Sequence, residues 1–157
     1  MRKAVADLHR LAEVSQAANN RYLGALAVVD LPVPVKSLVQ DILKPTLLNE
    51  RRVRAINPWS ENDANLLESV MRGEFTINGF RNRNLRQILF GISQDPQEGK
   101  KRSAQISRKL RMLRAHGIIK KVAHTHRYHV TEKGRSIISA LMAARNANAN
   151  QLTKLAA

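Results

Sequence analysis

The sequence predicts a mainly α-helical protein with one small antiparallel β-hairpin. Over most of the chain, apolar residues recur at the three- and four-residue spacing of amphipathic helices. Between residues 118 and 130, two short runs rich in β-forming residues are separated by a few polar ones. Glycine, proline and asparagine fall between these segments, where turns are expected. A chain of 157 residues can bury a core without cross-links.

The N-terminal part, residues 1–29, is predicted to form one long amphipathic helix. It contains no proline, and its apolar residues cluster on one side of a helical wheel. The helix is expected to end at Asp30–Pro34, because two prolines there remove backbone donors and restrict the residues before them. Residues 30–59 are expected to be a connector without a clear period, apart from a short helical turn at Leu38–Leu43.

A second helix is predicted to begin at Ser60. The Ser60 hydroxyl is placed to cap the first turn, and Asp63 occupies the position from which an acidic side chain reaches back in a capping box. Leu66, Leu67, Val70 and Met71 form its apolar stripe, and Gly73 is expected to end it.

The segment after this helix predicts a strand, a turn and a further short helix. Phe75–Ile77 alternates as a short strand does, and Asn78–Gly79 is typical of a turn. Asn82 or Asn84 is placed to cap a short helix that extends to Gly91. Residues 93–99, which contain an Asp-Pro pair, are expected to be a loop.

The most informative element is a helix predicted over residues 100–116. At 100° per residue, Ile106, Leu110 and Leu113 stack on one side. Gly117 suits the left-handed position that ends a helix. The other side carries a mostly basic and polar set, namely Lys101, Ala104, Gln105, Arg108, Arg111 and Met112.

A tight β-ribbon and a last helix follow. Ile118–Val122 and Arg127–Val130 are the predicted strands, and Thr131 is placed to cap the helix after them. From residue 60 to residue 134 the order is helix, strand, helix, helix, strand, strand, helix. This is the order of a winged helix-turn-helix domain, here with N- and C-terminal helical extensions. Residues 135–157 are expected to continue the last helix and to fray at their end.

Positive charge is concentrated in the predicted winged-helix segment. The chain has a formal net charge of +15. Residues 1–80 carry 10 Lys and Arg against 9 Asp and Glu, whereas residues 81–134 carry 14 against 3 and residues 135–157 carry 3 against none. Such a concentration in a structured segment indicates a polyanion footprint. The alternative is a solvated basic face without a partner.

Several stretches resemble a known group of proteins. Ser107–Leu110, with Leu113 and His116–Ile119, resembles the end of the recognition helix in bacterial winged-helix transcription regulators of the MarR and ArsR kind. Tyr128–Arg135 resembles the step from strand to helix that follows their wing. The resemblance covers about residues 60–143. It implies duplex DNA binding in transcriptional regulation or an accessory role in DNA transactions, and a homodimer built by the helices before and after the module.

The basic residues indicate a division of labour on DNA. The start of the 100–116 helix, with its positive dipole end, is expected to bind phosphate. Outward side chains in mid-helix are expected to reach base edges, since arginine pairs with guanine and glutamine with adenine. The hairpin and the helix before Gly91 are expected to grip the flanking backbone. The predicted DNA-binding residues are Arg81, Arg83, Arg86, Lys100, Lys101, Arg102, Ser103, Gln105, Ser107, Arg108, Arg111, Lys120, Lys121, His124, His126 and Arg127.

Other functions have less support in the sequence. His124 and His126 share a strand face but His129 does not, and no cysteine completes a metal site, so no metal or cofactor is predicted. Glycine-rich phosphate loops, nucleophile elbows and paired carboxylates are missing, so we expect no catalysis. The alternative to DNA binding is an adaptor module whose basic face binds an acidic protein or structured RNA within a larger complex.

The composition also bears on the compartment. The chain has no cysteine, which is compatible with a reducing environment. Its first apolar stretch is interrupted by Asp7, His9, Arg10 and Glu13, unlike a signal peptide, and no segment reaches the ~20 apolar residues that a membrane span needs. A soluble, cytoplasmic protein without a membrane partner is therefore expected.

Overall fold

The computed structural model describes residues 12–17, 19–20, 34–92 and 94–147. Residues 12–17 and 19–20 are helical, in agreement with the predicted N-terminal helix. The rest of that helix and the tail after residue 147 lie outside the described residues. From residue 34 onward the elements are α2 (Val35–Val39), β1 (Thr46–Leu48), β2 (Arg51–Val53), α3 (Glu61–Val70), α4 (Gly73–Asn78), α5 (Asn82–Phe90), α6 (Pro96–Ala115), β3 (Ile119–Lys121), β4 (Tyr128–Val130) and α7 (Glu132–Asn146).

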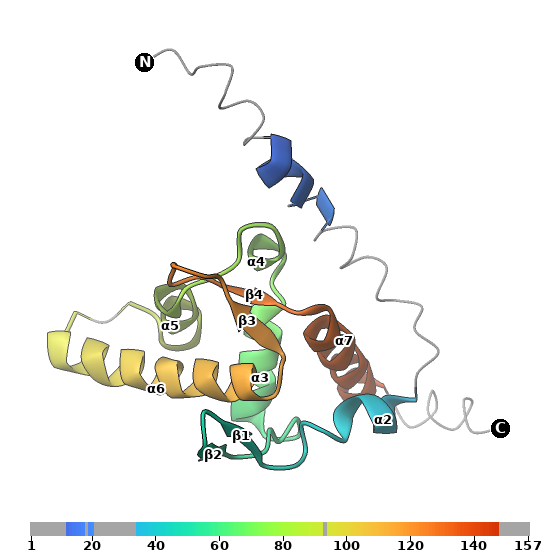
Figure 1. Ribbon diagram of the computed structural model, residues 1–157. Helices are drawn as coiled ribbons and strands as arrows, with labels where there is room; N and C mark the ends of the chain where they lie inside the picture. Colours follow the sequence, from blue (N-terminus) through green and yellow to red (C-terminus); the bar gives the residue numbers. More distant parts are fainter. Residues whose placement is uncertain (1–11, 18, 21–33, 93, 148–157) are drawn as a thin grey trace.

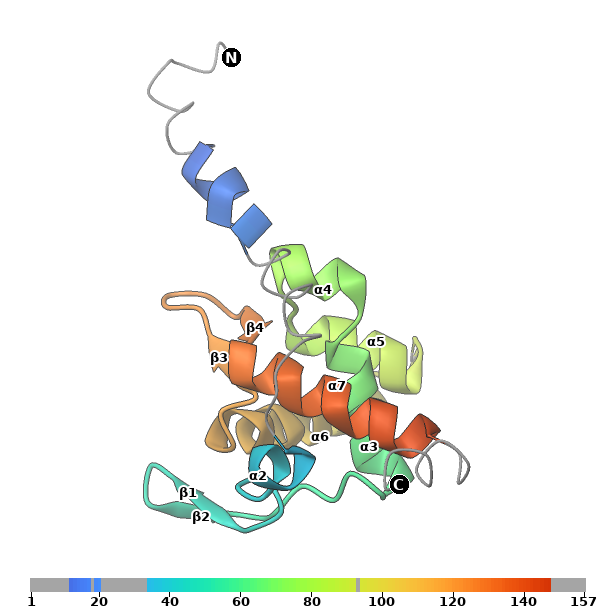
Figure 2. The same ribbon diagram turned by 90° about the vertical axis from the view of Figure 1, so that its right-hand side faces the viewer.

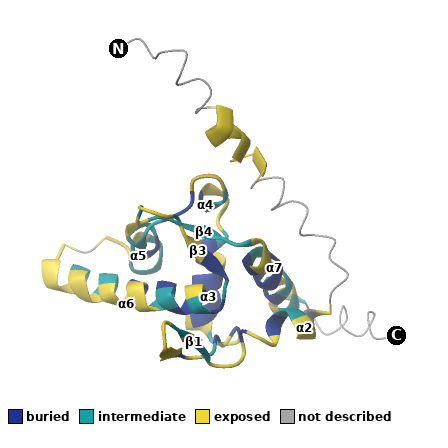
Figure 3. Ribbon diagram, in the orientation of Figure 1, coloured by how far each residue is buried: buried dark blue, intermediate teal, exposed yellow. Residues whose placement is uncertain are grey.

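The protein is mainly helical, and α3 lies at its centre. On one side α3 packs against α5, which in turn packs against α6; on the other side it contacts α7, which is covered by α2 (Figure 1). Leu66, Leu67 and Val70 of α3 are fully buried. So are Ile106 and Leu113 of α6 and Ile137 and Ile138 of α7. Figure 3 shows this buried centre and the exposed start of α6. Each such side chain contributes roughly 1.5–3 kcal/mol on burial.

The predicted hairpin is present as β3 and β4, which pair antiparallel with Lys120 opposite His129. A third strand position comes from Phe80, whose N–H donates to the Tyr128 carbonyl at 2.9 Å and whose carbonyl accepts from the Tyr128 N–H at 2.8 Å. The Phe80 ring stacks on the Tyr128 ring, with 6.0 Å between the centroids. The first residue of β4, next to the tip of the hairpin, is thus joined by backbone hydrogen bonds to the segment between α4 and α5.

The prediction of a strand at Phe75–Ile77 is wrong, because these residues lie in α4. Phe75 is the buried residue of this short helix, and its ring lies 5.3 Å from that of Phe80. In a segment of only three residues, one buried side chain is compatible with a helical turn and with a strand. The apolar pattern of Phe75–Ile77 therefore does not distinguish these two structures. The pairing expected of this segment is made by Phe80, after Gly79.

Residues 34–59 are not an irregular connector. α2 begins and ends slightly before the predicted turn at Leu38–Leu43, and β1 and β2 form a second antiparallel hairpin, with Leu47 opposite Arg52. Its two loop residues, Asn49 and Glu50, have φ of 49° and 61°. Both positive φ values are those of a type I′ turn, which usually has glycine at its second position. Glu50 occupies that position here, so the sequence does not indicate a hairpin.

The first turn of α3 is organised differently from the predicted capping box. Ser60 is the N-cap residue but its hydroxyl makes no capping hydrogen bond. Asp63 instead turns into the protein, where its carboxylate accepts two hydrogen bonds of 2.7 Å from the Arg54 guanidinium and one of 3.0 Å from the Asn57 N–H. The helix ends at Val70, and Gly73 begins α4 rather than ending α3.

The helices that follow have well-defined ends. The N-cap of α5 is Arg81, so neither Asn82 nor Asn84 stands at the predicted capping position. Asn84 instead lies in the first turn and accepts from the Arg81 N–H at 2.9 Å, and α5 ends before Gly91 as predicted. α6 begins one turn earlier than expected, because Asp95 caps it by accepting from the Gln97 and Glu98 N–H groups and Pro96 is its first residue. It ends before Gly117, whose φ of 70° confirms the predicted left-handed position.

The last helix confirms its predicted cap, since the Thr131 hydroxyl accepts from the Gly134 N–H at 2.9 Å. Gly134 lies directly against the backbone of Ile118, and a Cβ at this position would be 2.1 Å from the Ile118 oxygen. The apolar side of α7 is buried against α2 and α3 of the same chain. Among the described residues, none of the helices is long and apolar enough to cross a membrane.

Candidate nucleic-acid interface

The exposed side of α6 carries most of the predicted recognition residues. Lys101, Gln105 and Arg108 are exposed, Arg111 is half-buried, and Lys100 and Ser107 are exposed beside them. The opposite side of the same helix carries Ile106, Leu110 and Leu113 into the core. The amphipathic helix predicted by the sequence is therefore present, with its cationic side toward solvent.

Met112 departs from the predicted pattern. The helical wheel groups it with the arginines, but it is only 4 % exposed. Met112 lies at the edge of the outward side, and this edge faces the β1–β2 hairpin, which packs against α6. The sequence does not predict that hairpin, so the burial of this edge is missed.

The expected phosphate site at the start of α6 requires correction. Because the helix begins at Pro96, Lys100, Lys101, Arg102 and Ser103 lie beyond the first turn, where backbone N–H groups already have helical partners. The N-terminus itself is capped by the Asp95 side chain and carries Glu98 in its first turn. Two acidic groups therefore occupy the positive end of the helix dipole.

Three predicted site residues of α6, Arg102, Ser103 and Ser107, instead join α6 to α5. Arg102 donates to the Phe90 carbonyl at 2.7 Å, pairs with Glu98 and stacks on the Phe90 ring. Ser103 donates to the Asn82 side chain, whose amide nitrogen donates to the Ser107 hydroxyl at 2.9 Å and to the Ser103 carbonyl at 3.0 Å. These contacts fix the angle between the two helices and so position the exposed side of α6.

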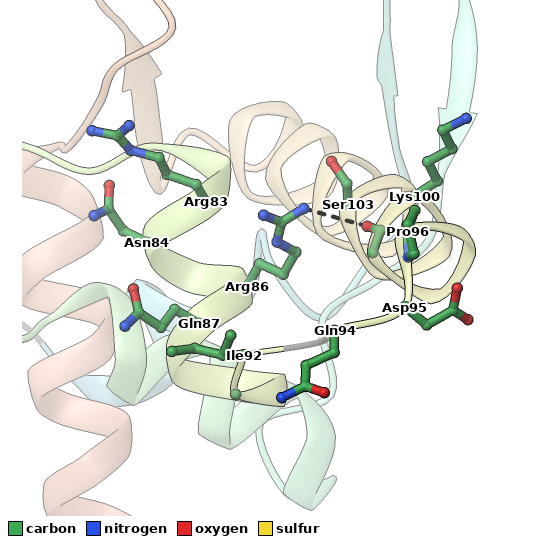
Figure 4. Close-up of a pocket in the computed structure, with 12 residues that line it drawn as sticks. Arg83, Asn84, Arg86, Gln87, Ile92, Gln94, Asp95, Pro96, Lys100 and Ser103 are labelled. Atoms are coloured by element: carbon green, nitrogen blue, oxygen red, sulfur yellow. Dashed lines mark hydrogen bonds between the residues drawn. The ribbon is translucent and has the colours of Figure 1, made fainter.

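The arginines of α5 border a cleft between α5 and the start of α6 (Figure 4). The cleft has a volume of about 660 Å³. Arg83 is exposed at its edge, whereas Arg86 reaches across from α5 and donates to the Gly99 carbonyl at 3.4 Å. Lys100 borders it from α6, and Asp95 is the one acidic residue among the described lining residues. The balance of charge in this cleft is positive.

Arg81 is held differently from its two neighbours on α5. It is half-buried, and its Nε is enclosed and makes no hydrogen bond within the described part of the chain. Its pocket, between α4, α5 and Arg127 of the β3–β4 hairpin, is also bordered by Arg72, Arg83 and the acidic Glu74. Arg81 thus adds to the charge of this region while presenting little of its side chain to solvent.

The β3–β4 hairpin presents four of its five predicted contact residues to solvent. Lys120, Lys121, His124 and His126 are exposed. Arg127 is half-buried, and its guanidinium donates to the Asn78 carbonyl at 2.7 Å, which ties the hairpin to α4. The tip is tightened by the Thr125 hydroxyl, which accepts from the Arg127 N–H at 3.1 Å. Across the described residues, no three His, Asp or Glu side chains are grouped as metal ligands.

The sequence does not indicate a second group of cations beside α6. Arg52 and Arg54 on or after β2, with Arg108, Lys109 and Arg111 on α6, border a further cleft of about 640 Å³. Residues 51–54 fall in the predicted connector, and only the register of β1 with β2 brings them next to α6. No local signal in the sequence would have found them, because the partners are more than 50 residues apart.

Polar contacts, some of them partly buried, hold this second group in place. Burial tends to raise the pKa of Asp63, but the hydrogen bonds from Arg54 and the Asn57 N–H outweigh it and leave the pKa below its usual value. Burial lowers the pKa of Lys109, whose ammonium group donates to the Asn62 side chain at 2.7 Å. Nε2 of His116, a buried residue, lies 2.9 Å from the Arg54 carbonyl.

Comparisons with models of protein families, with curated proteins and with solved structures give no match to this chain. The functional interpretation therefore depends on the geometry and charge of this surface.

Proposed function

We propose that this protein binds duplex DNA with α6 as its recognition helix and the β3–β4 hairpin as a wing. The observation that carries the proposal is the surface of α6. Two turns of a 20-residue helix expose Lys101, Gln105 and Arg108 on one side while the other side is fixed in the core. A helix fits the major groove of B-DNA, which is ~12 Å wide, and so places such side chains against base edges.

The surrounding residues support contacts to the sugar-phosphate backbone. Lys120 and Lys121 project from a hairpin whose strand β4 is joined to Phe80, and Arg83 is exposed on α5. Backbone contacts of this kind orient a protein on the duplex without reading its sequence. In this arrangement Arg108 and Gln105 contribute to sequence preference, whereas the lysines of the hairpin contribute to affinity for every sequence. The biological setting that fits this activity is transcriptional control or an accessory role in DNA transactions.

A salt titration of duplex binding tests the proposal. If about five phosphates are neutralised, the plot of log K against log salt concentration has a slope near −4.5. The measurement is made on wild-type protein with a duplex of about 20 base pairs by fluorescence anisotropy. A slope near zero, or no binding at low salt, contradicts the proposal.

A second candidate function is binding of an acidic protein or a structured RNA as an adaptor. The observation that favours it is Trp59, whose side chain is 66 % exposed outside α6 and both hairpins. Exposed tryptophan is enriched at the energetic centres of protein interfaces. Competition of RNA against duplex DNA, together with light scattering to determine mass, separates the two. Tighter binding of RNA than of duplex DNA supports the adaptor. So does binding of RNA that added duplex DNA does not reduce.

Dimerisation through the terminal helices has less support from the structure than duplex binding has. The apolar side of α7 packs inside its own chain, and the greater part of the predicted N-terminal helix lies outside the described residues. The mass from light scattering also tests the homodimer directly. A monomeric mass with full duplex affinity would mean that one copy binds DNA alone.

A further inference from the structure

We propose that the β1–β2 hairpin is a second backbone-binding ribbon, which grips the phosphates on the side of α6 opposite the β3–β4 wing. The inference rests on the proposed function, and it adds a contact surface that neither the sequence pattern nor the winged-helix order predicts. Its basis is the placement of the hairpin, its charge, and the way it is anchored.

The two hairpins lie on either side of α6. β1 packs against α6, and β3 follows α6 through the turn at Gly117 and packs against it as well. In Figures 1 and 2, α6 lies between the two hairpins, and in Figure 2 both extend toward the same side of the molecule. A duplex that receives α6 in its groove on this side therefore passes between two ribbons.

The surface between β2 and α6 is strongly cationic. Of the described residues that line the 640 Å³ cleft between them, five are Lys or Arg and none is Asp or Glu. Arg52, exposed on β2, lines it from the hairpin, and Arg108, exposed on α6, lines it from the helix. Arg51 is exposed next to Arg52 and adds to the charge of the ribbon. Clustered cations of this density attract a polyanion, and arginine forks match phosphate oxygens.

The hairpin is fixed before any ligand arrives. Val53 is buried, and Arg54 forms its bidentate pair with Asp63 of α3. The Arg54 carbonyl lies 2.9 Å from Nε2 of His116, at the end of α6. Arg54 therefore holds the ribbon to the start of α3, and Lys109 holds α6 to the same turn through Asn62. Arg51, Arg52 and Arg108 are the groups presented to a backbone. A surface that is already ordered loses less conformational entropy on binding.

The test compares three double variants with equal loss of charge. Arg51→Gln with Arg52→Gln alters the β1–β2 hairpin, and Lys120→Gln with Lys121→Gln alters the wing. Lys36→Gln with Lys133→Gln is the control on α2 and at the start of α7, and it also removes the exposed ion pair of Lys133 with Asp41. If each hairpin neutralises two phosphates, the salt slope of either hairpin variant is smaller in magnitude by about 1.8, and duplex affinity at 0.1 M salt falls roughly tenfold to a hundredfold. The control keeps the wild-type slope.

A gain of charge separates binding from folding. Glu50→Lys at the tip of the β1–β2 hairpin is expected to tighten duplex binding and to steepen the salt slope by up to about 0.9. Glu68→Lys, at an exposed position of α3, is the matched control and leaves the slope unchanged. Because Glu68→Lys adds the same charge, a gain confined to Glu50→Lys locates the effect at the hairpin even if the glutamine variants are unstable.

The outcomes distinguish this inference from the proposed function. If the wing variant loses affinity while the Arg51/Arg52 variant and Glu50→Lys both behave as their controls do, the inference is wrong and duplex binding by α6 and the wing stands. If wild-type protein shows no salt-dependent duplex binding, both fail. Loss in both hairpin variants, with gain in Glu50→Lys, supports the second ribbon.

Discussion

The two hairpins that flank α6 are similar in size but are held to the core by different means. The β3–β4 hairpin is joined to the segment between α4 and α5 by backbone, because Phe80 and Tyr128 exchange two hydrogen bonds. Each hairpin is also closed at its base by one backbone bond, from Thr131 N–H to the Ile118 carbonyl and from Ile56 N–H to the Ile42 carbonyl. The β1–β2 hairpin is joined largely by side chains, through Arg54 and Asp63 and through His116. The β3–β4 hairpin is therefore paired by backbone with a neighbouring segment, whereas the β1–β2 hairpin depends on side-chain contacts and on the burial of Val53.

This difference bears on how the surface around α6 is organised. Backbone pairing is retained under most substitutions, so the β3–β4 hairpin keeps its position while its side chains vary. An ion pair formed by one half-exposed arginine and one buried carboxylate is sensitive to the loss of either partner, because the buried charge is left without compensation. The comparison predicts that the two hairpins respond differently to mutation and to pH.

The largest expected change in the free energy of unfolding comes from a substitution beside the β3–β4 hairpin. Gly134→Ala places a Cβ 2.1 Å from the Ile118 oxygen, so α7 or the strand that starts the wing must move. We expect a loss of about 3 kcal/mol in the free energy of unfolding, at the upper end for overpacking. Chemical denaturation monitored by circular dichroism measures it.

Gly99→Ala is the matched control, because a Cβ added to Gly99 would have no other atom within 4 Å and the residue lies in a helix. This change is expected to stabilise the protein by about 0.5–1 kcal/mol through helix propensity. Equal effects at the two glycines would contradict the close approach at Gly134.

The next largest effect concerns the side-chain-held hairpin. Arg54→Ala leaves the Asp63 side chain, 3 % exposed, without its cationic partner. Because the arginine is 59 % exposed, solvent screening limits the loss, which we expect to be about 1–2 kcal/mol. Amide hydrogen exchange is expected to show the amides of β1 and β2 losing protection while those of β3 and β4 keep theirs.

Arg52→Ala serves as the control for this substitution, since Arg52 is exposed on the same hairpin. Its effect on stability is expected to stay within about 0.5 kcal/mol. If Arg54→Ala destabilises both hairpins alike, the proposed difference in anchoring is wrong.

A smaller effect is expected from pH. The pKa of Asp63 is lowered in the folded protein relative to about 3.9 in an unfolded chain. Its contribution to stability is therefore fully present above pH ~4 and is lost as the pH falls through the lower, folded value. Urea denaturation between pH 2 and 7 is expected to show this loss in wild-type protein and a smaller one in Asp63→Asn. Identical pH profiles for the two proteins would exclude Asp63 as a source of the pH dependence.

The elements that the sequence predicts well are those with strong periodicity or clear caps. Ile106, Leu110 and Leu113 have helical spacing and identify α6. Gly117 indicates the turn after α6, and Thr131 indicates the start of α7. The β1–β2 hairpin is missed because its turn, Asn49–Glu50, lacks glycine and each strand has only three residues. Short elements of this kind depend on tertiary contacts that local pattern does not contain.

The candidate site is predictable in its charge and less so in the role of each cation. Exposure of Arg108 follows from its place on the wheel. The wheel does not predict that Arg102 donates to the Phe90 carbonyl and Arg127 to the Asn78 carbonyl, because these carbonyls belong to α5 and α4. Which arginines stabilise the fold and which remain available depends on packing between helices.

The central claim is that the exposed side of α6 reads the duplex while the elements beside it bind the backbone. Selection of preferred sequences from a random duplex pool, carried out with wild-type protein, Arg108→Ala and Lys121→Ala, tests it most directly. We predict that Arg108→Ala loses preference at one or two base pairs, worth about 1–3 kcal/mol, whereas Lys121→Ala keeps the preference and weakens all sequences alike. Uniform losses in both variants, with an unchanged selected sequence, would contradict the claim.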